Sequence, residues 1–299
     1  MSNETYIASP SVVAYAGRKK IDLSDVARKS GRLTLAKEDV DSHMNQSAPT
    51  ASSTPAAGEY WDVDHAAFGP VSPEPLSRMA RVASANLSAA NAMIPQVTHH
   101  DRADMRRLEA FRASQKAEAA RRGVRLTALA FHVKALAICL QEFPRFNASL
   151  SPDGGTLVLK HYVHIGIAVD TPHGLLVPVI RDADKKGLWQ IAASIADLAT
   201  RAQARKIRPD EMGGASMSIS NLGGIGGTAF TPIVNPPELA ILGITRTETV
   251  PVWEDERWRP VPMTPLDLSY DHRVINGADA ARFLARYAKL LADPRRMVI

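Results

Sequence analysis

The chain of 299 residues contains a single cysteine, Cys139, and no long uninterrupted apolar run. One cysteine excludes a disulfide framework and any metal site built from several thiolates, and it fits a reducing cytoplasm. The most apolar stretch, residues 126–140, is interrupted by His132 and Lys134 and is shorter than the roughly 20 residues that a membrane helix needs. The first residues show no signal-peptide pattern. We therefore expect a cytoplasmic protein with no membrane partner.

Charge of either sign is also modest, with 36 Lys and Arg against 31 Asp and Glu and a net charge of +5. No long Lys/Arg run is present, so nucleic acid is not an expected partner. A mildly basic surface still favours a polyanionic small molecule such as a nucleotide-bearing cofactor. Apolar residues make up 45% of the chain, which is an ordinary globular composition with enough residues for a sizeable core.

Composition divides the chain into three parts. Residues 1–44 contain a helix start at Ser9 and Pro10 and are predicted to form a small helical domain. Residues 45–59 are mostly Ala, Ser, Thr and Pro, which is typical of a semi-extended linker. Residues 60–299 are predicted to form one α/β domain with a mixed sheet. Its predicted helices cover residues 107–121, 126–142, 188–205 and 278–292. Its predicted strands cover residues 162–169, 175–180, 217–220, 239–244 and 266–270.

The strongest catalytic candidate is His272, in the segment LDLSYDHRVINGADAARF. An apolar strand ends at Tyr270, and Asp271, His272 and Arg273 stand together before an Asn-Gly turn and a helix. Such strand-to-helix junctions often display catalytic side chains, and an imidazole with a pKa near ~6.5 can accept a proton at neutral pH. From these residues alone, a structural histidine in a charged turn is an equally open interpretation.

A second candidate is Ser220 in SMSISNLGGIGGTAFTPIVNPPE, residues 216–238, where a predicted strand leads into a glycine cluster. A hydroxyl group and backbone amides at that point could hold an oxyanion. The cluster lacks the Lys-Ser/Thr of a phosphate-binding loop, and a proline-containing segment follows it instead of a helix. Taken by itself, the segment fits a turn that needs glycines better than a nucleotide site.

Other reactive side chains favour structural roles. Cys139 and His132 lie in the predicted apolar helix and are interpreted as buried core residues. His99 and His100 are adjacent and lack a cluster of Cys or His partners, so no metal site is predicted. Three methionines are predicted to fill the core: Met79, Met93 and Met105.

These two segments, together with VHIGIAVDTPHGLLVPVIRD, resemble the dihydrolipoamide acyltransferase components of 2-oxo acid dehydrogenase complexes, most closely the acetyltransferases of bacterial pyruvate dehydrogenase. The resemblance covers about residues 60–299 and, more weakly, residues 7–44. It implies a two-layer α/β sandwich similar to chloramphenicol acetyltransferase, in homotrimers that can assemble into a larger cubic core. It also implies transfer of an acyl group, here acetyl, between dihydrolipoamide and coenzyme A, with acetyl-CoA as a substrate and no metal.

The resemblance also implies roles for single residues. His272 is similar to the general base that takes the thiol proton, and Ser220 to the hydroxyl that the adjacent subunit donates to the tetrahedral oxyanion. Asn276 occupies the usual aspartate position of the DHRVxDG pattern. The acetyltransferase branch also carries Asn there, so Asn276 does not exclude activity, but it supplies no negative charge at this position. The coenzyme A contacts of the family fall on five positions: Arg112, Thr127, Asp170, Ser220 and Asn221.

The sequence departs from the family in two places. It contains no lipoyl-domain motif with a lysine in an Asp-Lys-Ala turn, so we expect a lipoyl domain of another protein to supply the lipoyl group in trans. Residues 7–44 resemble a peripheral-subunit-binding domain, but Val13 and Gly17 stand where interface arginines are usual, and residues 27–30 replace a Gly-Thr-Gly loop. Because lost charges reduce steering and specificity, we predict weakened or altered binding to the decarboxylase or to dihydrolipoamide dehydrogenase.

Two alternatives to this function stay open. A stand-alone coenzyme A-dependent acyltransferase with another small acceptor would explain the missing lipoyl motif, although the long match through SISNLGGIGG and VDTPHGLLVPV disfavours it. A non-catalytic structural subunit of a 2-oxo acid dehydrogenase complex is the other alternative. A subunit freed from catalysis would have no physical reason to keep both His272 and Ser220.

Overall fold

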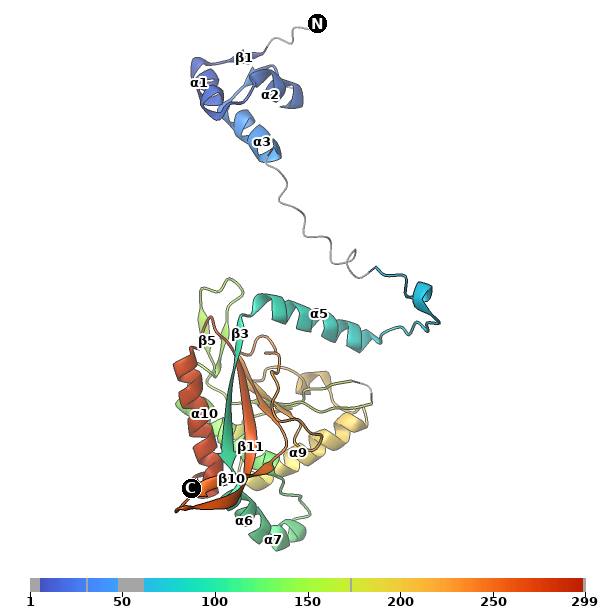
Figure 1. Cartoon of the computed structure of the whole chain (residues 1–299), viewed down its shortest axis with the longest axis vertical. Helices are drawn as coiled ribbons and strands as arrows, with labels where there is room; N and C mark the ends of the chain where they lie inside the picture. Colours follow the sequence, from blue (N-terminus) through green and yellow to red (C-terminus); the bar gives the residue numbers. More distant parts are fainter. Residues whose placement is uncertain (1–5, 31, 48–61, 173, 298–299) are drawn as a thin grey trace. The chain divides into compact units, whose positions relative to one another are not determined.

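The computed structural model describes residues 6–30, 32–47, 62–172 and 174–297. Contacts divide the chain into two compact units, Met1–Glu74 and Pro75–Ile299 (Figure 1). The linker predicted for residues 45–59 falls mostly outside the described residues, and its first residues continue the last helix of the first unit. Each unit is described by itself.

The first unit contains three helices, α1 (Pro10–Lys19), α2 (Leu23–Ser30) and α3 (Lys37–Ser47). Helix α1 begins as predicted, with an extended Ser9 before Pro10 at the first helical position. Two short parallel strands, β1 (Ile7–Ala8) and β2 (Thr34–Leu35), lie beside the helices. The buried side chains of this unit are Val12, Ala16, Leu23, Val26, Leu35 and Val40.

Helix α2 begins at Leu23, although the residues that follow Leu23 are mostly polar. Leu23 and Val26 are spaced one helical turn apart and are both buried in the small core. The Asp22 carboxylate accepts a hydrogen bond from the Ser24 N–H at 2.9 Å and so satisfies a free amide at the helix start. Two apolar anchors and one cap are sufficient to order a segment that is otherwise polar.

The second unit combines one large sheet with helices. Its helices are α5 (Arg78–Met93), α6 (Arg106–Ser114), α7 (Lys116–Arg121), α8 (Ala128–Glu142), α9 (Leu188–Gln203) and α10 (Gly277–Ala292). The strands of the sheet are β3 (Gln96–Asp104), β6 (Ile165–Ile167), β7 (Val179–Ile180), β8 (Met217–Asn221), β9 (Ala240–Ile244), β10 (Glu248–Glu254) and β11 (Arg257–Asp271). A separate hairpin is made of β4 (Ala148–Leu150) and β5 (Leu157–Leu159).

The sheet is mixed, as the sequence predicted. Strands β6, β8 and β9 are parallel, whereas β11 is antiparallel to β9, β10 and β3. The order along the sheet is β10-β11-β9-β8-β6-β7, and β3 also pairs with β11. Because β6, β8 and β9 run in the same direction, their carboxyl ends lie on one edge, and the end of β11 lies toward the opposite edge.

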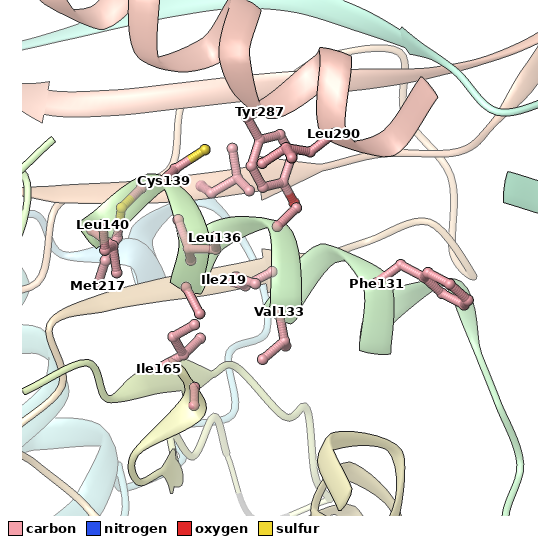
Figure 2. Close-up of a cluster of buried hydrophobic side chains, with 14 of the residues drawn as sticks. Phe131, Val133, Leu136, Cys139, Leu140, Ile165, Met217, Ile219, Tyr287 and Leu290 are labelled. Atoms are coloured by element: carbon pink, nitrogen blue, oxygen red, sulfur yellow. The ribbon is translucent and has the colours of Figure 1, made fainter. Parts of the chain in front are cut away.

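Helices α8 and α10 pack together and cover the sheet with an apolar layer (Figure 2). Phe131, Val133 and Leu136 on α8 have no measurable exposure, nor do Tyr287 and Leu290 on α10. Ile165 from β6 and Met217 and Ile219 from β8 complete this cluster from below the helix. Burial of this apolar area, at ~25 cal/mol per Å2, is what orders the sheet against its helices.

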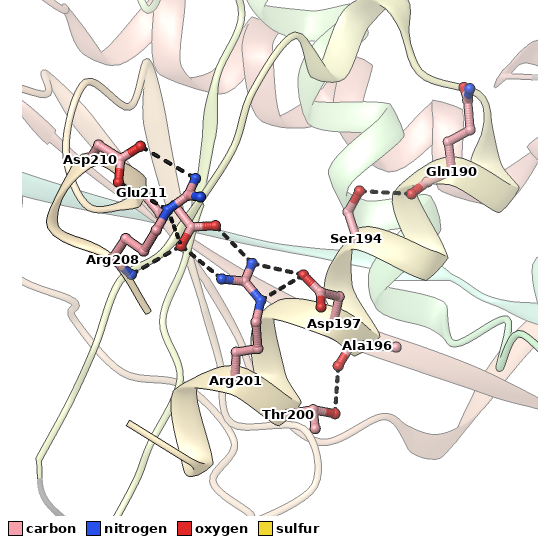
Figure 3. Close-up of polar contacts among 9 residues, drawn as sticks. All are labelled: Gln190, Ser194, Ala196, Asp197, Thr200, Arg201, Arg208, Asp210 and Glu211. Carbon is pink, nitrogen blue, oxygen red and sulfur yellow. Dashed lines mark hydrogen bonds and ion pairs between the residues drawn. The ribbon is translucent and has the colours of Figure 1, made fainter. Parts of the chain in front are cut away.

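Helix α9 is tied to the turn that precedes β8 by an ion-pair network (Figure 3). The Arg201 guanidinium donates to Glu211 at 2.7 Å and to Asp197 at 2.7 Å. Glu211 also accepts the Arg208 N–H at 3.0 Å, within the short turn η3 (Pro209–Glu211). Bidentate arginine contacts fix geometry well, so this network holds η3 against α9.

Several helix, strand and burial predictions differ from the structure. The helix predicted for residues 107–121 is divided at Gln115 into α6 and α7. The strand predicted for 266–270 is only the end of the much longer β11, whose prolines argue against a strand when the sequence is considered alone. Met105 is buried as predicted, but Met79 and Met93 on α5 are exposed, because Ala90 is the buried residue of that helix.

Candidate active site

His272 projects from the tight turn between β11 and α10. The Asp271 carboxylate is buried and accepts hydrogen bonds from Arg273 through Nη2 at 2.6 Å and through the backbone N–H at 3.0 Å. The His272 N–H donates to the carbonyl of Pro95 at 3.1 Å, while the imidazole is exposed. The Asp271–Arg273 pair thus holds the turn rigid and presents the His272 ring to solvent.

Asn276 is the N-cap of α10. Its backbone is extended, and its side-chain oxygen accepts the Asp279 N–H at 2.8 Å. This is the capping geometry for which Asn is well suited. Because the side-chain oxygen of Asn276 accepts the capping hydrogen bond, its amide NH2 is the group that can donate a hydrogen bond to a substrate near His272.

Ser220 is the last residue but one of strand β8, at the edge where the parallel strands finish. The register pairs Ile167 of β6 with Ile219 of β8, so Asp170 and Asn221 share that edge with Ser220. The Asn221 side chain accepts the Gly223 N–H at 2.9 Å and orders the start of the glycine-rich segment. The sequence candidates Asp170, Ser220 and Asn221 are therefore brought together.

His272 and Ser220 are not brought together within one chain. Ser220 pairs with Gly243 on β9, and Gly243 pairs with Asp267 on β11. The step from Asp267 to His272 at ~3.3 Å per residue, combined with two strand spacings of ~4.8 Å, gives a separation of roughly 19 Å. A general base and an oxyanion donor that serve one reacting carbonyl must be far closer than this.

Arg112 and Thr127 lie on other elements. Arg112 is on α6, where its Nε donates to Glu109 at 2.9 Å, and Thr127 stands at the N-cap position of α8. Among the described residues, no hydrogen bond or ion pair joins either side chain to Ser220. Their predicted contact with coenzyme A stays a prediction.

The two reactive side chains of α8 are buried, as predicted. The His132 Nδ1 lies 2.7 Å from the Tyr287 hydroxyl, and burial lowers the pKa of His132 to about 4. Burial also raises the pKa of the Cys139 thiol to about 12, so Cys139 is not a nucleophile at neutral pH. These two groups stabilise the core and take no part in the site.

The described part of the chain contains no group of three or more His, Cys, Asp or Glu side chains that could hold a metal ion. None of its helices has both the length and the apolar character that crossing a bilayer requires.

The model of the family 2-oxoacid dehydrogenases acyltransferase (catalytic domain) matches residues 69–299. The chain belongs to this family. It is 46% identical over 300 residues to the dihydrolipoyllysine-residue acetyltransferase component of the pyruvate dehydrogenase complex of Azotobacter vinelandii, a match that covers 98% of this chain and 47% of that relative. The chain thus spans about half the length of this curated relative.

Solved structures of acyltransferases from this family share the fold. The Azotobacter vinelandii dihydrolipoamide acetyltransferase is 51% identical and has a TM-score of 0.78, covering 79% of this chain and 98% of that one. The cubic core of the pyruvate dehydrogenase multienzyme complex is 52% identical, with the same TM-score and coverage. The α/β acyltransferase fold expected from the sequence is therefore confirmed.

One charged residue near the site was missed by the sequence analysis. Glu238 is buried just before β9, where its Oε1 accepts hydrogen bonds from the Ser218 hydroxyl at 2.9 Å and from Asn235 Nδ2 at 3.2 Å. Burial raises the pKa of Glu238 to about 6. The available signal was a lone carboxylate directly preceding the apolar run LAILG, where an acidic side chain costs free energy unless something satisfies it.

Proposed function

We propose that residues 60–299 form the catalytic domain of a dihydrolipoamide acetyltransferase, an enzyme that moves an acetyl group between coenzyme A and dihydrolipoamide. One observation carries this proposal. The solved Azotobacter vinelandii enzyme was investigated for the catalytic roles of a serine, a histidine and an asparagine. Those three residues follow one another in the same order and at the same spacing as Ser220, His272 and Asn276 in this chain.

His272 acts as the general base in this proposal. A free thiol has a pKa of ~8.5, so little thiolate exists at neutral pH without a base. The imidazole takes the proton as the sulfur attacks the thioester carbonyl, and it returns the proton to the departing thiolate when the tetrahedral intermediate collapses. General base catalysis of this kind contributes ~10²–10⁴-fold. The exposed, rigidly held ring of His272 suits this task.

Ser220 stabilises the oxyanion of the tetrahedral intermediate by donating its hydroxyl hydrogen. A single donor of this kind is worth ~10²–10³-fold. Because His272 and Ser220 lie roughly 19 Å apart in one chain by strand geometry, each active site combines His272 of one subunit with Ser220 of its neighbour. A homotrimer provides this arrangement by closed symmetry, and trimers assemble further into a cubic core like that of the similar solved structure.

Coenzyme A binds at the edge where the parallel strands end. Asp170, Ser220 and Asn221 share this edge, and Arg112 and Thr127 contact the same molecule. The Asn276 amide NH2, left over from the helix cap, orients the thioester near His272. Acetyl-CoA thus approaches the site from the edge that carries Ser220. The dihydrolipoyl group approaches it from the other side, where His272 lies.

The dihydrolipoyl group reaches the site on a lipoyl domain that lies outside these 299 residues and is supplied in trans. Residues 1–44 form a peripheral-subunit-binding-like domain with weakened or altered partner binding. Val13 supports this, since it is exposed on α1 and offers an apolar side chain where an arginine would attract an acidic partner.

The proposed function is tested by acetyl transfer from acetyl-CoA, with the purified protein, to free dihydrolipoamide and to a separate lipoyl domain. We expect transfer to both, and a loss of at least ~10²-fold in His272→Ala with an unchanged oligomer mass by light scattering. A folded oligomer that transfers to neither acceptor would contradict the proposal. Transfer to dihydrolipoamide alone would contradict supply in trans.

A further inference from the structure

A cavity of about 390 Å3 lies beside the turn that carries His272. Its walls come from the second half of α5, from the β4–β5 hairpin and from the segment 235–239 before β9. Asp271 and Arg273, the two neighbours of His272, complete the wall. This volume falls within the ~300–1,000 Å3 typical of small-molecule sites. Ala89 and Met93 are exposed α5 residues in its lining, so the cavity opens to the surface.

Glu238 lines this cavity and carries one unsatisfied oxygen. Its side chain is 4% exposed, and Oε1 accepts both available hydrogen bonds, from Ser218 and Asn235. Oε2 is buried and has no hydrogen-bond partner. An unsatisfied buried acceptor of this kind costs ~1–3 kcal/mol, more when it is charged. A ligand that brings an N–H or O–H donor into the cavity would remove this cost.

The charges around the cavity select against an anion. Asp271 and Arg273 neutralise each other as an ion pair, so Glu238 is the charged lining residue that no other lining residue neutralises. The phosphates of coenzyme A are thus disfavoured here, which agrees with a coenzyme A site at the opposite edge. The remaining lining includes the apolar side chains of Leu150, Pro236 and Leu239. An uncharged chain with a terminal amide matches this lining.

We infer that the cavity binds the alkyl chain and terminal amide of the dihydrolipoyl substrate, with Glu238 accepting a hydrogen bond from the amide N–H. The inference rests on the proposed function and names a specificity residue for its second substrate. The Asp271 N–H donates to the Leu239 carbonyl at 2.9 Å, so His272 and Glu238 are each the chain neighbour of a residue in that bond. The amide is anchored at Glu238 while the thiol reaches His272.

The decisive variant is Glu238→Gln. The Ser218 and Asn235 donors will hold the Gln oxygen at the present Oε1 position, so the Gln NH2 takes the place of Oε2. A donor then faces the amide N–H of the substrate. We expect the KM for dihydrolipoamide to rise about tenfold, as for one lost hydrogen bond to a charged acceptor, with the KM for acetyl-CoA unchanged.

A comparison of dihydrolipoamide with dihydrolipoate separates recognition from a structural role. The acid presents a carboxylate where the amide presents N–H, so Glu238 repels it in the wild type. We expect Glu238→Gln to reduce the preference for the amide over the acid, measured as a ratio of kcat/KM values, by at least tenfold. A carboxylate that only supports the fold, or that is satisfied by water, would leave this ratio unchanged, and that result would overturn the inference.

A second variant narrows the cavity without changing Glu238. Ala89→Leu adds bulk from the exposed face of α5 and should raise the KM for dihydrolipoamide, whereas Ala92→Leu on the same helix should not. Glu248→Gln, at an exposed position on β10, is the matched control for the charge change. An equal KM for dihydrolipoamide in Ala89→Leu and Ala92→Leu would contradict the assignment of this cavity to the dihydrolipoyl substrate.

Failure of the proposed function is distinguishable from failure of this inference. If the wild type acetylates neither thiol, the proposed function is wrong, and calorimetric titration with lipoamide tests the cavity directly. Weaker binding to Glu238→Gln than to wild type would then support the cavity, and equal or absent binding would refute it. If the wild type is active and the amide-to-acid ratio does not move, only the inference fails.

Discussion

Gly243 stands at a position of β9 where the structure has no room for a side chain. It lies between Ser220 on β8 and Asp267 on β11. A Cβ at this position would lie 2.7 and 2.8 Å from two ring atoms of Phe230 and 3.1 Å from the Asp267 Cβ. Carbon atoms prefer separations of ~3.5–4.0 Å, so Phe230 must move to accept even one methyl group. The Phe230 N–H also donates to Asp267 at 3.3 Å, which limits that movement.

We predict that Gly243→Ala lowers the free energy of unfolding by ~1–3 kcal/mol, the usual cost of overpacking. Denaturant unfolding at a fixed protein concentration measures this cost, since subunit association contributes to stability. In a Phe230→Ala background the methyl group has space, so the same substitution should cost much less. The coupling between the two positions is then ~1 kcal/mol or more.

An equal loss of unfolding free energy from Gly243→Ala with and without the Phe230 ring would contradict this prediction. Acetyl transfer provides a second readout, because Phe230 lies in the glycine-rich segment that follows Ser220. Displacement of that segment should lower kcat in Gly243→Ala and restore it in part in the double variant. Independent behaviour of the two substitutions in both assays would show that Phe230 does not fill the space over Gly243.

Two further predictions concern single side chains. Ser220→Ala should lower kcat by ~10²–10³-fold with little change in the KM for acetyl-CoA, and a decrease below tenfold in steady-state assays would argue against the oxyanion role. His132 has a pKa of about 4 in the fold against 6.5 for the free side chain. Its contribution to stability is complete above pH ~6.5, and ~3 kcal/mol is lost as the pH falls toward 4, because the unfolded chain binds the proton first. His132→Gln should flatten this part of the profile of unfolding free energy against pH, and an unchanged slope would contradict it.

The turn that carries His272 could be predicted from local sequence because its geometry is local. Asp271, His272 and Arg273 pair within the turn itself, and Asn276 caps the helix that begins directly after it. Helix α10 begins one residue from its predicted start, since the apolar spacing and the Asn-Gly signal agree. The same local logic located the end of β8 at the Ser220–Asn221 step.

The long hairpin and the first strand of the sheet could not be predicted in the same way. Strand β11 contains Pro260, Pro262 and Pro265, and β3 has the polar sequence QVTHHDRAD. Tertiary pairing overrides these weak local preferences, because β3 and β11 pair along the full length of β3. The distance between His272 and Ser220 depends on the pairing of β8 with β9 and of β9 with β11, which is also tertiary, so a site shared between subunits could be predicted only from family resemblance.

The role of Glu238 could not be predicted from the sequence for a third reason. A carboxylate beside two prolines and an apolar run has no periodicity that marks it as functional. Its importance follows from burial, from its unsatisfied oxygen and from the cavity, and all three depend on how α5 and the β4–β5 hairpin meet β9.

We propose above that each active site combines His272 of one subunit with Ser220 of its neighbour. Co-expression of His272→Ala and Ser220→Ala subunits in equal amounts tests it directly, because each variant alone is inactive. Random mixing in a closed ring gives about one quarter of the sites both wild-type residues, so we predict about one quarter of the wild-type acetyl transfer. Activity no higher than that of the separate variants, in verified mixed oligomers, would place both residues in the same chain's site and contradict the account.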